Sequence, residues 1–285
     1  MAEFGAHPQA RPGGGRRVLV TGAAGPIGRI ACAGLAARGW KVRGLDKVPL
    51  DGVDGLADPP VLAEVTDAGA VRRATEGVDA VVHLAGMAAQ APSDQVLAAT
   101  IEGTFHVFDA ARRAGVSRVV HASGSHPVGL VPGSAPATAD VPPRPDTYSG
   151  VSMVFGEALG RLMVDRYGLE VVCLRIGSWK QYPTSVPELS TWISPADGVR
   201  LLAAALTAPD VGFAIVYGIS ANTRARWDLA PARALGYLSV DDAEEYADRI
   251  PGADADPHPD RVDPGRPGAA SAGPADDEPR PGQES

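Results

Sequence analysis

Short runs of β-branched and apolar residues alternate with longer segments of helical periodicity along most of the chain. Strands are predicted, in chain order, at residues 16–22, 40–46, 61–67, 79–86, 117–123, 169–177 and 212–218. Helices are predicted between them at residues 26–39, 94–114, 149–167 and 194–208. Apolar strands separated by helices are typical of a parallel sheet that is covered on both faces. The pattern therefore predicts an α/β fold, a Rossmann-like doubly wound parallel sheet.

The two ends of the chain lack this periodicity. Residues 1–15 are rich in Gly and Pro, and residues 251–285 hold Pro, Gly, Ala and Asp with almost no large apolar side chain. Such segments bury too little surface to offset the entropy of ordering, so both are predicted to be disordered. The remaining residues 16–250 are expected to form one domain, with a small C-terminal substrate lobe at about 176–235.

Composition narrows the class of protein. Of the 285 residues 45% are hydrophobic, enough for a sizeable core, and no apolar run approaches the roughly 20 residues of a membrane span. The formal charge of −8 argues against nucleic acid as a partner, since that needs a basic face. No signal peptide is recognisable and Cys32 and Cys173 match no metal spacing, so a cytoplasmic protein with two buried thiols is expected. The many aliphatic side chains would suit a homodimer built on paired helices.

A glycine-rich loop lies between the first predicted strand and the first predicted helix. It reads VTGAAGPIGR, with Gly22, Gly25 and Gly28 in the order G-x-x-G-x-x-G and with Pro26 and Ile27 opening the helix. Glycines permit a tight turn and a close approach of the backbone to a pyrophosphate, and the helix start offers free N–H groups to that anion. The strand–loop–helix context predicts a dinucleotide site, and a purely structural turn is the alternative.

Two aspartates follow later strands. Asp46 ends the second strand at about the offset expected of the acidic residue that binds the adenosine ribose. A carboxylate there repels a 2′-phosphate and favours NAD over NADP, although the adjacent Lys47 softens that repulsion. Asp67 is placed to meet the adenine edge or, equally, to cap a helix N-terminus.

Several motifs together resemble the short-chain dehydrogenase/reductase superfamily, in its NAD-dependent epimerase/dehydratase-like branch. They are VTGAAGPIGR, the aspartate after the second strand, VTD at 65–67, VVHLAG at 81–86 and FGE at 155–157. LRIGSW at 174–179, ELSTWISPADGVRLL at 188–202 and FAIVYGISAN at 213–222 are most similar to the uronate dehydrogenases, which oxidise hexuronic acids with NAD. The resemblance covers residues 16–250. It implies NAD as the cofactor, with Leu84, Ala85 and Gly86 beside it.

The catalytic residues of that family are altered in this chain. The family uses a Ser, a Tyr and a Lys four residues after the Tyr, and a gapless comparison puts these three positions at Gly124, Ser149 and Met153. Tyr148 comes one residue early, and on a helix it would point about 100° away from the site. None of the six tyrosines has a lysine four residues later, so the pair is missing in either register.

The resemblance also assigns substrate contacts. His126 and Ser178 match substrate-site residues, and Ser125, Ser149 and Met153 would line the same pocket. The arginine that would clamp a uronate carboxylate becomes Pro187, and a small polar residue after the fourth strand becomes Ala88 or a neighbour. A neutral or differently shaped substrate is therefore expected in place of a hexuronate.

Three functions remain open. The leading expectation is atypical, non-redox acid/base chemistry beside a bound NAD: dehydration, cyclisation, epimerisation or a lyase reaction on a small polar or natural-product substrate. The available groups are His126, Tyr148, Ser123 and Ser125. His126 is the best acid/base candidate because imidazole titrates nearest neutral pH, and a loop histidine bonded to a backbone carbonyl is the alternative.

The first alternative function is an NAD-dependent oxidoreductase of a sugar-like alcohol whose proton donor has moved to Tyr148 or His126. Tyrosine has an ordinary pKa of about 10, so a route through a phenolate would speed up at alkaline pH. The second alternative is a catalytically inactive NAD-binding protein.

Four further charged or ionisable side chains are assigned roles from the sequence. Arg175 either touches a nucleotide phosphate or pairs with a carboxylate, and Glu157 is expected to cap or pack its helix. His83 is expected in the core or beside the cofactor, and Lys180 at the surface. Three tryptophans are predicted to be core residues rather than walls for a ligand: Trp179, Trp192 and Trp227.

Overall fold

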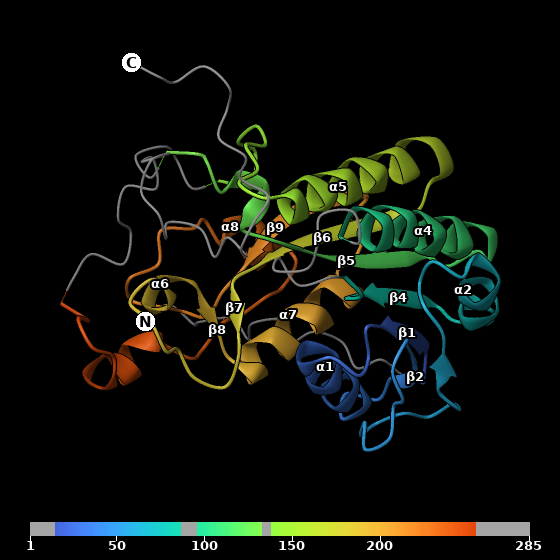
Figure 1. The fold of residues 1–285 in the computed structure, drawn as a ribbon, viewed down its shortest axis with the longest axis horizontal. Helices are drawn as coiled ribbons and strands as arrows, with labels where there is room; N and C mark the ends of the chain where they lie inside the picture. Colours follow the sequence, from blue (N-terminus) through green and yellow to red (C-terminus); the bar gives the residue numbers. More distant parts are fainter. Residues whose placement is uncertain (1–14, 87–95, 133–137, 255–285) are drawn as a thin grey trace, which may run out of the picture.

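A seven-stranded parallel sheet in the order β3-β2-β1-β4-β5-β6-β9 forms the centre of the molecule (Figure 1). The computed structural model describes residues 15–86, 96–132 and 138–254. The strands of the sheet are β1 (Arg17–Thr21), β2 (Lys41–Asp46), β3 (Val61–Leu62), β4 (Ala80–His83), β5 (Arg118–Gly124), β6 (Glu170–Ile176) and β9 (Phe213–Gly218). The order confirms the predicted doubly wound sheet.

Helices cover both faces of the sheet. On one face α1 (Pro26–Ala36) packs beside α7 (Pro195–Thr207), and on the other α2 (Ala68–Thr75), α4 (Gly103–Arg113) and α5 (Tyr148–Tyr167) lie side by side (Figure 1). Each layer of helices encloses its own apolar cluster against the strands. The strands are buried from both sides, and this is why they read as continuous apolar runs rather than as alternating ones.

The chain reverses its direction of travel across the sheet between β1 and β4. It runs outward from β1 through β2 to β3 and then returns to β4 on the other side of β1. Thr21 at the end of β1 is in register with Leu45 of β2 and with His83 of β4. Such a switch point leaves a crevice at the carboxyl ends of the strands, where ligands bind in open α/β sheets.

Three elements of the main sheet and its helices differ from the prediction. The third strand, expected at 61–67, is wrong over most of its length, because β3 comprises only Val61–Leu62 at the edge of the sheet. The residues after it lead into α2, a short helix that the pattern did not predict and that Asp67 caps. The helix expected at 94–114 is a π-helical turn, η1 (Ala98–Glu102), followed by α4.

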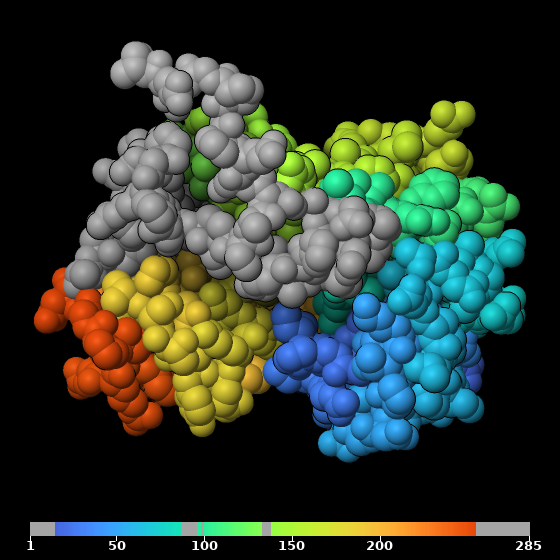
Figure 2. All heavy atoms as spheres, viewed as in Figure 1, coloured from blue at the N-terminus to red at the C-terminus, as the bar shows by residue number. Residues whose placement is uncertain are grey.

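The C-terminal lobe is built from short elements. A two-stranded parallel sheet of β7 (Ser178–Trp179) and β8 (Trp192–Ile193) joins α6 (Glu188–Thr191), and two further elements are α8 (Ala230–Ala234) and η3 (Ala243–Arg249). Leu189 and Trp192 are buried against η3, so the lobe extends beyond residue 235. Figure 2 shows α6 in yellow and η3 in orange-red at one end of the molecule, opposite β3 and α2. The segments predicted to be disordered lie, apart from residues 15 and 251–254, outside the described residues.

Candidate active site

The glycine-rich loop forms a tight cradle at the carboxyl end of β1. Gly22 has φ +71°, a left-handed conformation that favours glycine, and a Cβ atom there would lie 2.8 Å from the backbone nitrogen of Ala85. A Cβ atom at Gly28 would lie 2.0 Å from the carbonyl oxygen of Gly22. Both glycines are therefore required by close packing of loop, helix and strand, as in dinucleotide sites.

The start of α1 leaves its N–H groups available to an anion. Gly25 is the N-cap and Pro26 the first helical residue, followed by Ile27, and no side chain caps the helix. No acidic residue lies in the first turn, so the helix itself supplies no carboxylate to its positive end. This geometry suits a pyrophosphate.

The carboxylate of Asp46 is held beside this loop. Its Oδ2 accepts a hydrogen bond from the backbone of Ala24 at 2.9 Å, and its Oδ1 accepts one from Val48 at 3.2 Å. The side chain is half-buried at the end of β2. It is thus fixed where the nucleotide ribose is expected in this kind of fold.

The residues after β4 complete the cradle. The backbone N–H of Leu84 donates to the carbonyl oxygen of Thr21 at 3.2 Å, and that of Ala85 donates to Thr21 Oγ1 at 3.3 Å. Gly86 follows directly, whereas the predicted position near Ala88 lies outside the described residues. His83 is buried, and its ring nitrogens lie 2.7 Å from Thr21 Oγ1 and 3.0 Å from Thr104 Oγ1, which accounts for it as a core residue.

Asp67 is a helix cap in the structure. One carboxylate oxygen accepts from the backbone N–H of Ala70 at 2.9 Å. That hydrogen bond is the main cause of a lowered pKa for the Asp67 carboxyl. Of the two roles expected for Asp67, the cap is the one that its geometry displays.

Two of the three positions that the resemblance assigns to Ser, Tyr and Lys meet at the carboxyl end of β5. A Cβ atom at Gly124 would lie 3.4 Å from the sulfur of Met153, so the serine and lysine positions are in van der Waals contact. Ser149 is 6% exposed at the start of α5, whereas Tyr148 is 56% exposed. The two adjacent side chains thus face different environments, as the helical spacing predicts.

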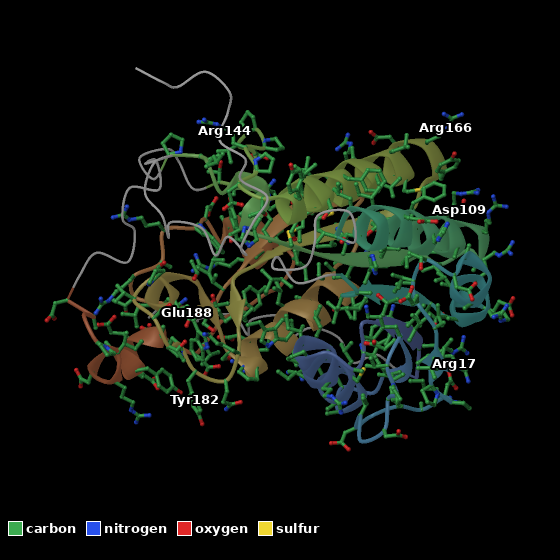
Figure 3. All side chains as sticks on the ribbon, viewed as in Figure 1. Arg17, Asp109, Arg144, Arg166, Tyr182 and Glu188 are labelled. Carbon is green, nitrogen blue, oxygen red and sulfur yellow. The ribbon has the colours of Figure 1, made fainter. Side chains whose placement is uncertain are left out.

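The lysine nearest in sequence to α5 is Lys180, and its ammonium is bound by other groups. The ammonium of Lys180 is 2.6 Å from Glu188 Oε1 and 2.8 Å from Thr184 Oγ1, on the loop before α6. Figure 3 labels Glu188 and Tyr182 on this lobe. Lys180 is therefore committed to an ion pair that holds the loop together.

A histidine–aspartate pair lies between the end of β5 and the start of α5. His126 opens a 3-10 turn, η2 (His126–Val128), and its Nδ1 is 2.8 Å from Asp146 Oδ1. The side chains are 26% and 17% exposed, so both are half-buried. Asp146 was not among the residues singled out from the sequence, and the alternative of a carbonyl partner for His126 Nδ1 is wrong.

Ser123 belongs to a buried ionic network beneath this pair. Its hydroxyl donates to Glu157 Oε1 at 2.8 Å, and the guanidinium of Arg175 donates to both oxygens of the same carboxylate at 2.9 Å. Burial disfavours the charged form of Arg175, yet the Glu157 carboxylate outweighs that effect and raises the pKa of the guanidinium. Arg175 therefore pairs with a carboxylate, the second of its two expected roles, and Glu157 does more than cap or pack.

Other predicted residues lie nearby or in the core. Ser125 precedes η2, and Ser178 begins β7 directly after β6. Trp179 and Trp192 are buried, and Trp227 stacks on Tyr217 with ring centroids 4.7 Å apart. The core interpretation of the first two tryptophans is confirmed.

The carboxyl ends of β1, β4 and β5 lie side by side at one edge of the sheet. Neighbouring strands are about 4.8 Å apart, and β5 continues to Gly124, beyond the residue His121 that is level with Thr21 and His83, so the end of β5 is on the order of 14 Å from the end of β1. The His126–Asp146 pair thus lies within a nucleotide's length of the cradle. Across the described ranges no cluster of His, Cys, Asp or Glu is arranged to hold a metal ion, and no helix is long and apolar enough to cross a membrane.

Comparisons with known proteins agree with this geometry. Residues 18–180 match the NAD dependent epimerase/dehydratase family. Uronate dehydrogenase of Pseudomonas syringae pv. tomato is 38% identical over 248 residues, which span 87% of this chain and 89% of that protein. L-arabinose 1-dehydrogenase (NAD(P)(+)) of Haloferax volcanii is 36% identical over 255 residues, 80% of this chain and 97% of that protein. A mutant uronate dehydrogenase from Agrobacterium tumefaciens, solved in complex with NAD, has a TM-score of 0.78 at 39% identity, covering 82% of this chain and 88% of that one.

These matches confirm the resemblance stated from the sequence, including an NAD-dependent family. They also bear on the reaction. The relatives carry the names of dehydrogenases, which favours the oxidoreductase alternative over the non-redox chemistry that was the leading expectation.

Proposed function

Because the chain belongs to the NAD dependent epimerase/dehydratase family, we propose that it is an NAD-dependent oxidoreductase of a sugar-like alcohol in which His126 receives the substrate proton. The observation that carries the proposal is the 2.8 Å contact between His126 Nδ1 and Asp146 Oδ1 at the end of β5. It supplies an oriented base beside the start of α5, where the resemblance assigns the tyrosine and lysine positions to Ser149 and Met153.

The nucleotide cradle fits NAD. A side chain at Gly22 or Gly28 would collide with the backbone around it. Because these two residues have no side chain, the loop backbone can approach a pyrophosphate closely. The start of α1 would receive the phosphates, and Asp46 would accept hydrogen bonds from the ribose hydroxyls. When bound, NAD supplies the hydride acceptor for oxidation of an alcohol to a carbonyl.

The chain itself has to move one proton. As the alcohol loses its hydride, its hydroxyl proton passes to a base, and a neutral imidazole with a free ring nitrogen accepts it. Since Nδ1 of His126 faces Asp146, Nε2 is the nitrogen left for the substrate. Tyr148, exposed at the first position of α5, is the second carrier that the sequence suggested.

The substrate is proposed to be neutral. Pro187 precedes α6 where the resemblance places the arginine that clamps a carboxylate, and it offers no charge. The nearby Lys180 is bound to Glu188. A hexuronate would lose its bidentate partner, whereas a neutral aldose needs none. The similarity to a protein named for L-arabinose supports this class.

Turnover by matched variants tests the proposal. The purified protein is given NAD and, in parallel, neutral aldoses and the two hexuronates glucuronate and galacturonate, and NADH is followed by its absorbance. We expect oxidation of at least one aldose, poor turnover of the hexuronates, and a loss of about 10²–10⁴-fold in kcat for His126→Gln with little change for Tyr148→Phe. Full activity of His126→Gln would refute His126 as the base. Loss of activity in Tyr148→Phe, with a rate that rises toward alkaline pH, would assign the proton to the tyrosine. Tight NAD binding without turnover of any alcohol would support the inactive nucleotide-binding alternative.

A further inference from the structure

We infer that Asp146 is a positioning residue, which holds the His126 imidazole with its proton on Nδ1 and its lone pair on Nε2. The inference rests on the proposed function, in which His126 Nε2 receives the substrate proton. It adds a residue that lies 20 positions along the chain from His126 and that belongs to none of the motifs of the resemblance.

The tautomer follows from the chemistry of the two partners. An ionised carboxylate only accepts hydrogen bonds, so the nitrogen that lies 2.8 Å from Asp146 Oδ1 has to be the donor. In a neutral imidazole the other nitrogen is then the acceptor. Asp146 therefore selects the form of His126 that can take up a proton at Nε2.

Backbone hydrogen bonds fix the two residues relative to each other. The N–H of Asp146 donates to the carbonyl oxygen of His126 at 3.3 Å, and the N–H of Arg144 donates to that of Pro127 at 2.8 Å. The N–H of Leu130 donates to the carbonyl oxygen of Arg144 at 2.9 Å. Figure 3 labels Arg144 on the segment that leads into α5. The pair thus sits on two chain segments that are tied together and does not depend on side chains alone.

Two glycines make room for the pair. A Cβ atom at Gly129 would lie 2.1 Å from the carboxyl carbon of Asp146, and one at Gly150 would lie 2.6 Å from the carbonyl oxygen of His126. Gly129 has φ −61° and Gly150 lies in α5, so neither backbone conformation requires glycine. Gly129 therefore leaves the space that the Asp146 carboxyl group occupies, and Gly150 leaves the space that the backbone of His126 occupies.

Asp146 would also stabilise the product of proton transfer. Once Nε2 has taken the proton, the imidazolium carries a positive charge that faces the Asp146 carboxylate, a charge-assisted hydrogen bond of the stronger kind. The same arrangement of aspartate and histidine orients the base in serine proteases, where asparagine leaves the geometry intact but favours the wrong tautomer.

The test is Asp146→Asn in the full chain, with Asp165→Asn as the matched control. Asp165 lies on α5, the helix that begins shortly after Asp146, and its carboxylate pairs with Arg161 at the surface. We expect kcat of Asp146→Asn to fall by about two to four orders of magnitude while KM and NAD affinity stay the same, and the control to match the wild type. A kcat within about twofold of the wild type would overturn the inference.

A second measurement needs neither substrate nor turnover. Nitrogen NMR of histidine-labelled protein reports which ring nitrogen carries the proton. In the wild type the His126 signals should show the proton on Nδ1, and in Asp146→Asn it should move to Nε2. A wild-type signal with the proton on Nε2 would overturn the inference even if the variant fails to fold. Full activity of His126→Gln defeats the proposed function, whereas an inactive His126→Gln beside a fully active Asp146→Asn defeats only the role of Asp146.

Discussion

The buried imidazole of His121 should make the protein sensitive to mild acid. Neither ring nitrogen of His121 has a hydrogen-bond partner among the described residues, and the ring lies between His83, Phe108 and Gly156. Burial lowers the pKa of His121 from 6.5 to about 4, against a smaller opposing effect of the Glu157 charge. Burial and the adjacent His121 also lower the pKa of His83.

These pKa values determine the direction and the size of the change in unfolding free energy with pH. A base whose pKa is lower in the folded state takes up its proton first in the unfolded chain, so acid favours unfolding. Above pH 6.5 the His121 imidazole is neutral in both states and does not lower the free energy of unfolding. As the pH falls from 6.5 to about 4, the unfolded chain binds this proton and the folded protein does not, so the free energy of unfolding decreases. Each pH unit in that window corresponds to about 1.4 kcal/mol per proton, so His121 alone should cost about 3 kcal/mol of unfolding free energy at the acid end.

Urea unfolding at a series of pH values, for the wild type and for His121→Leu, measures this effect. Leucine is apolar and of similar volume, and the carboxylates that titrate in the same window are common to both proteins, so the difference in slope isolates the imidazole. We expect the wild type to lose about 3 kcal/mol more than the variant between neutral pH and about pH 4. Parallel curves for the two proteins would refute the reasoning, whatever their difference at neutral pH.

Three further substitutions test the nucleotide loop and the buried network. Gly28→Ala places a methyl group 2.0 Å from the Gly22 carbonyl oxygen, so we expect urea unfolding to show a loss of about 1–3 kcal/mol and calorimetry to show weaker NAD binding; unchanged values would contradict the close packing. Asp46→Asn removes the charge that disfavours a 2′-phosphate, and titration should show the affinity for NADP relative to NAD rising about tenfold, whereas an unaltered ratio would mean that Asp46 does not face the ribose. Glu157→Leu leaves the Arg175 charge buried and unpaired and should cost about 3–5 kcal/mol in urea unfolding; adding Arg175→Met should restore most of it, and failure to do so would argue against the ion pair as the cause.

The sequence predicted those features whose determinants are local. The apolar strands and the loop around Gly22 and Gly28 are written in consecutive residues, and Asp46 follows from its distance to that loop. The parallel, doubly wound sheet followed from the alternation of strands with helices, whereas the order of the strands came from the structure. Even the different exposures of Tyr148 and Ser149 follow from one helical step.

The features that the sequence did not predict depend on contacts between segments that are distant along the chain. His126 and Asp146 are 20 residues apart, and an aspartate in a proline-rich stretch is typical of a turn. A retrospective signal existed in Gly129 and Gly150, whose meaning is clear only once the pair between them is known. The lobe strands β7 and β8 contain two residues each, too few for any period to be recognised.

The contact between Gly124 and Met153 restricts what a substitution at either position alone can achieve. A lysine at Met153 alone would bring an ammonium to a half-buried position without the tyrosine that it serves, and a serine at Gly124 alone would set its hydroxyl against a thioether. Because the two positions are in contact, the effects of substituting both are expected to differ from the sum of the two single effects.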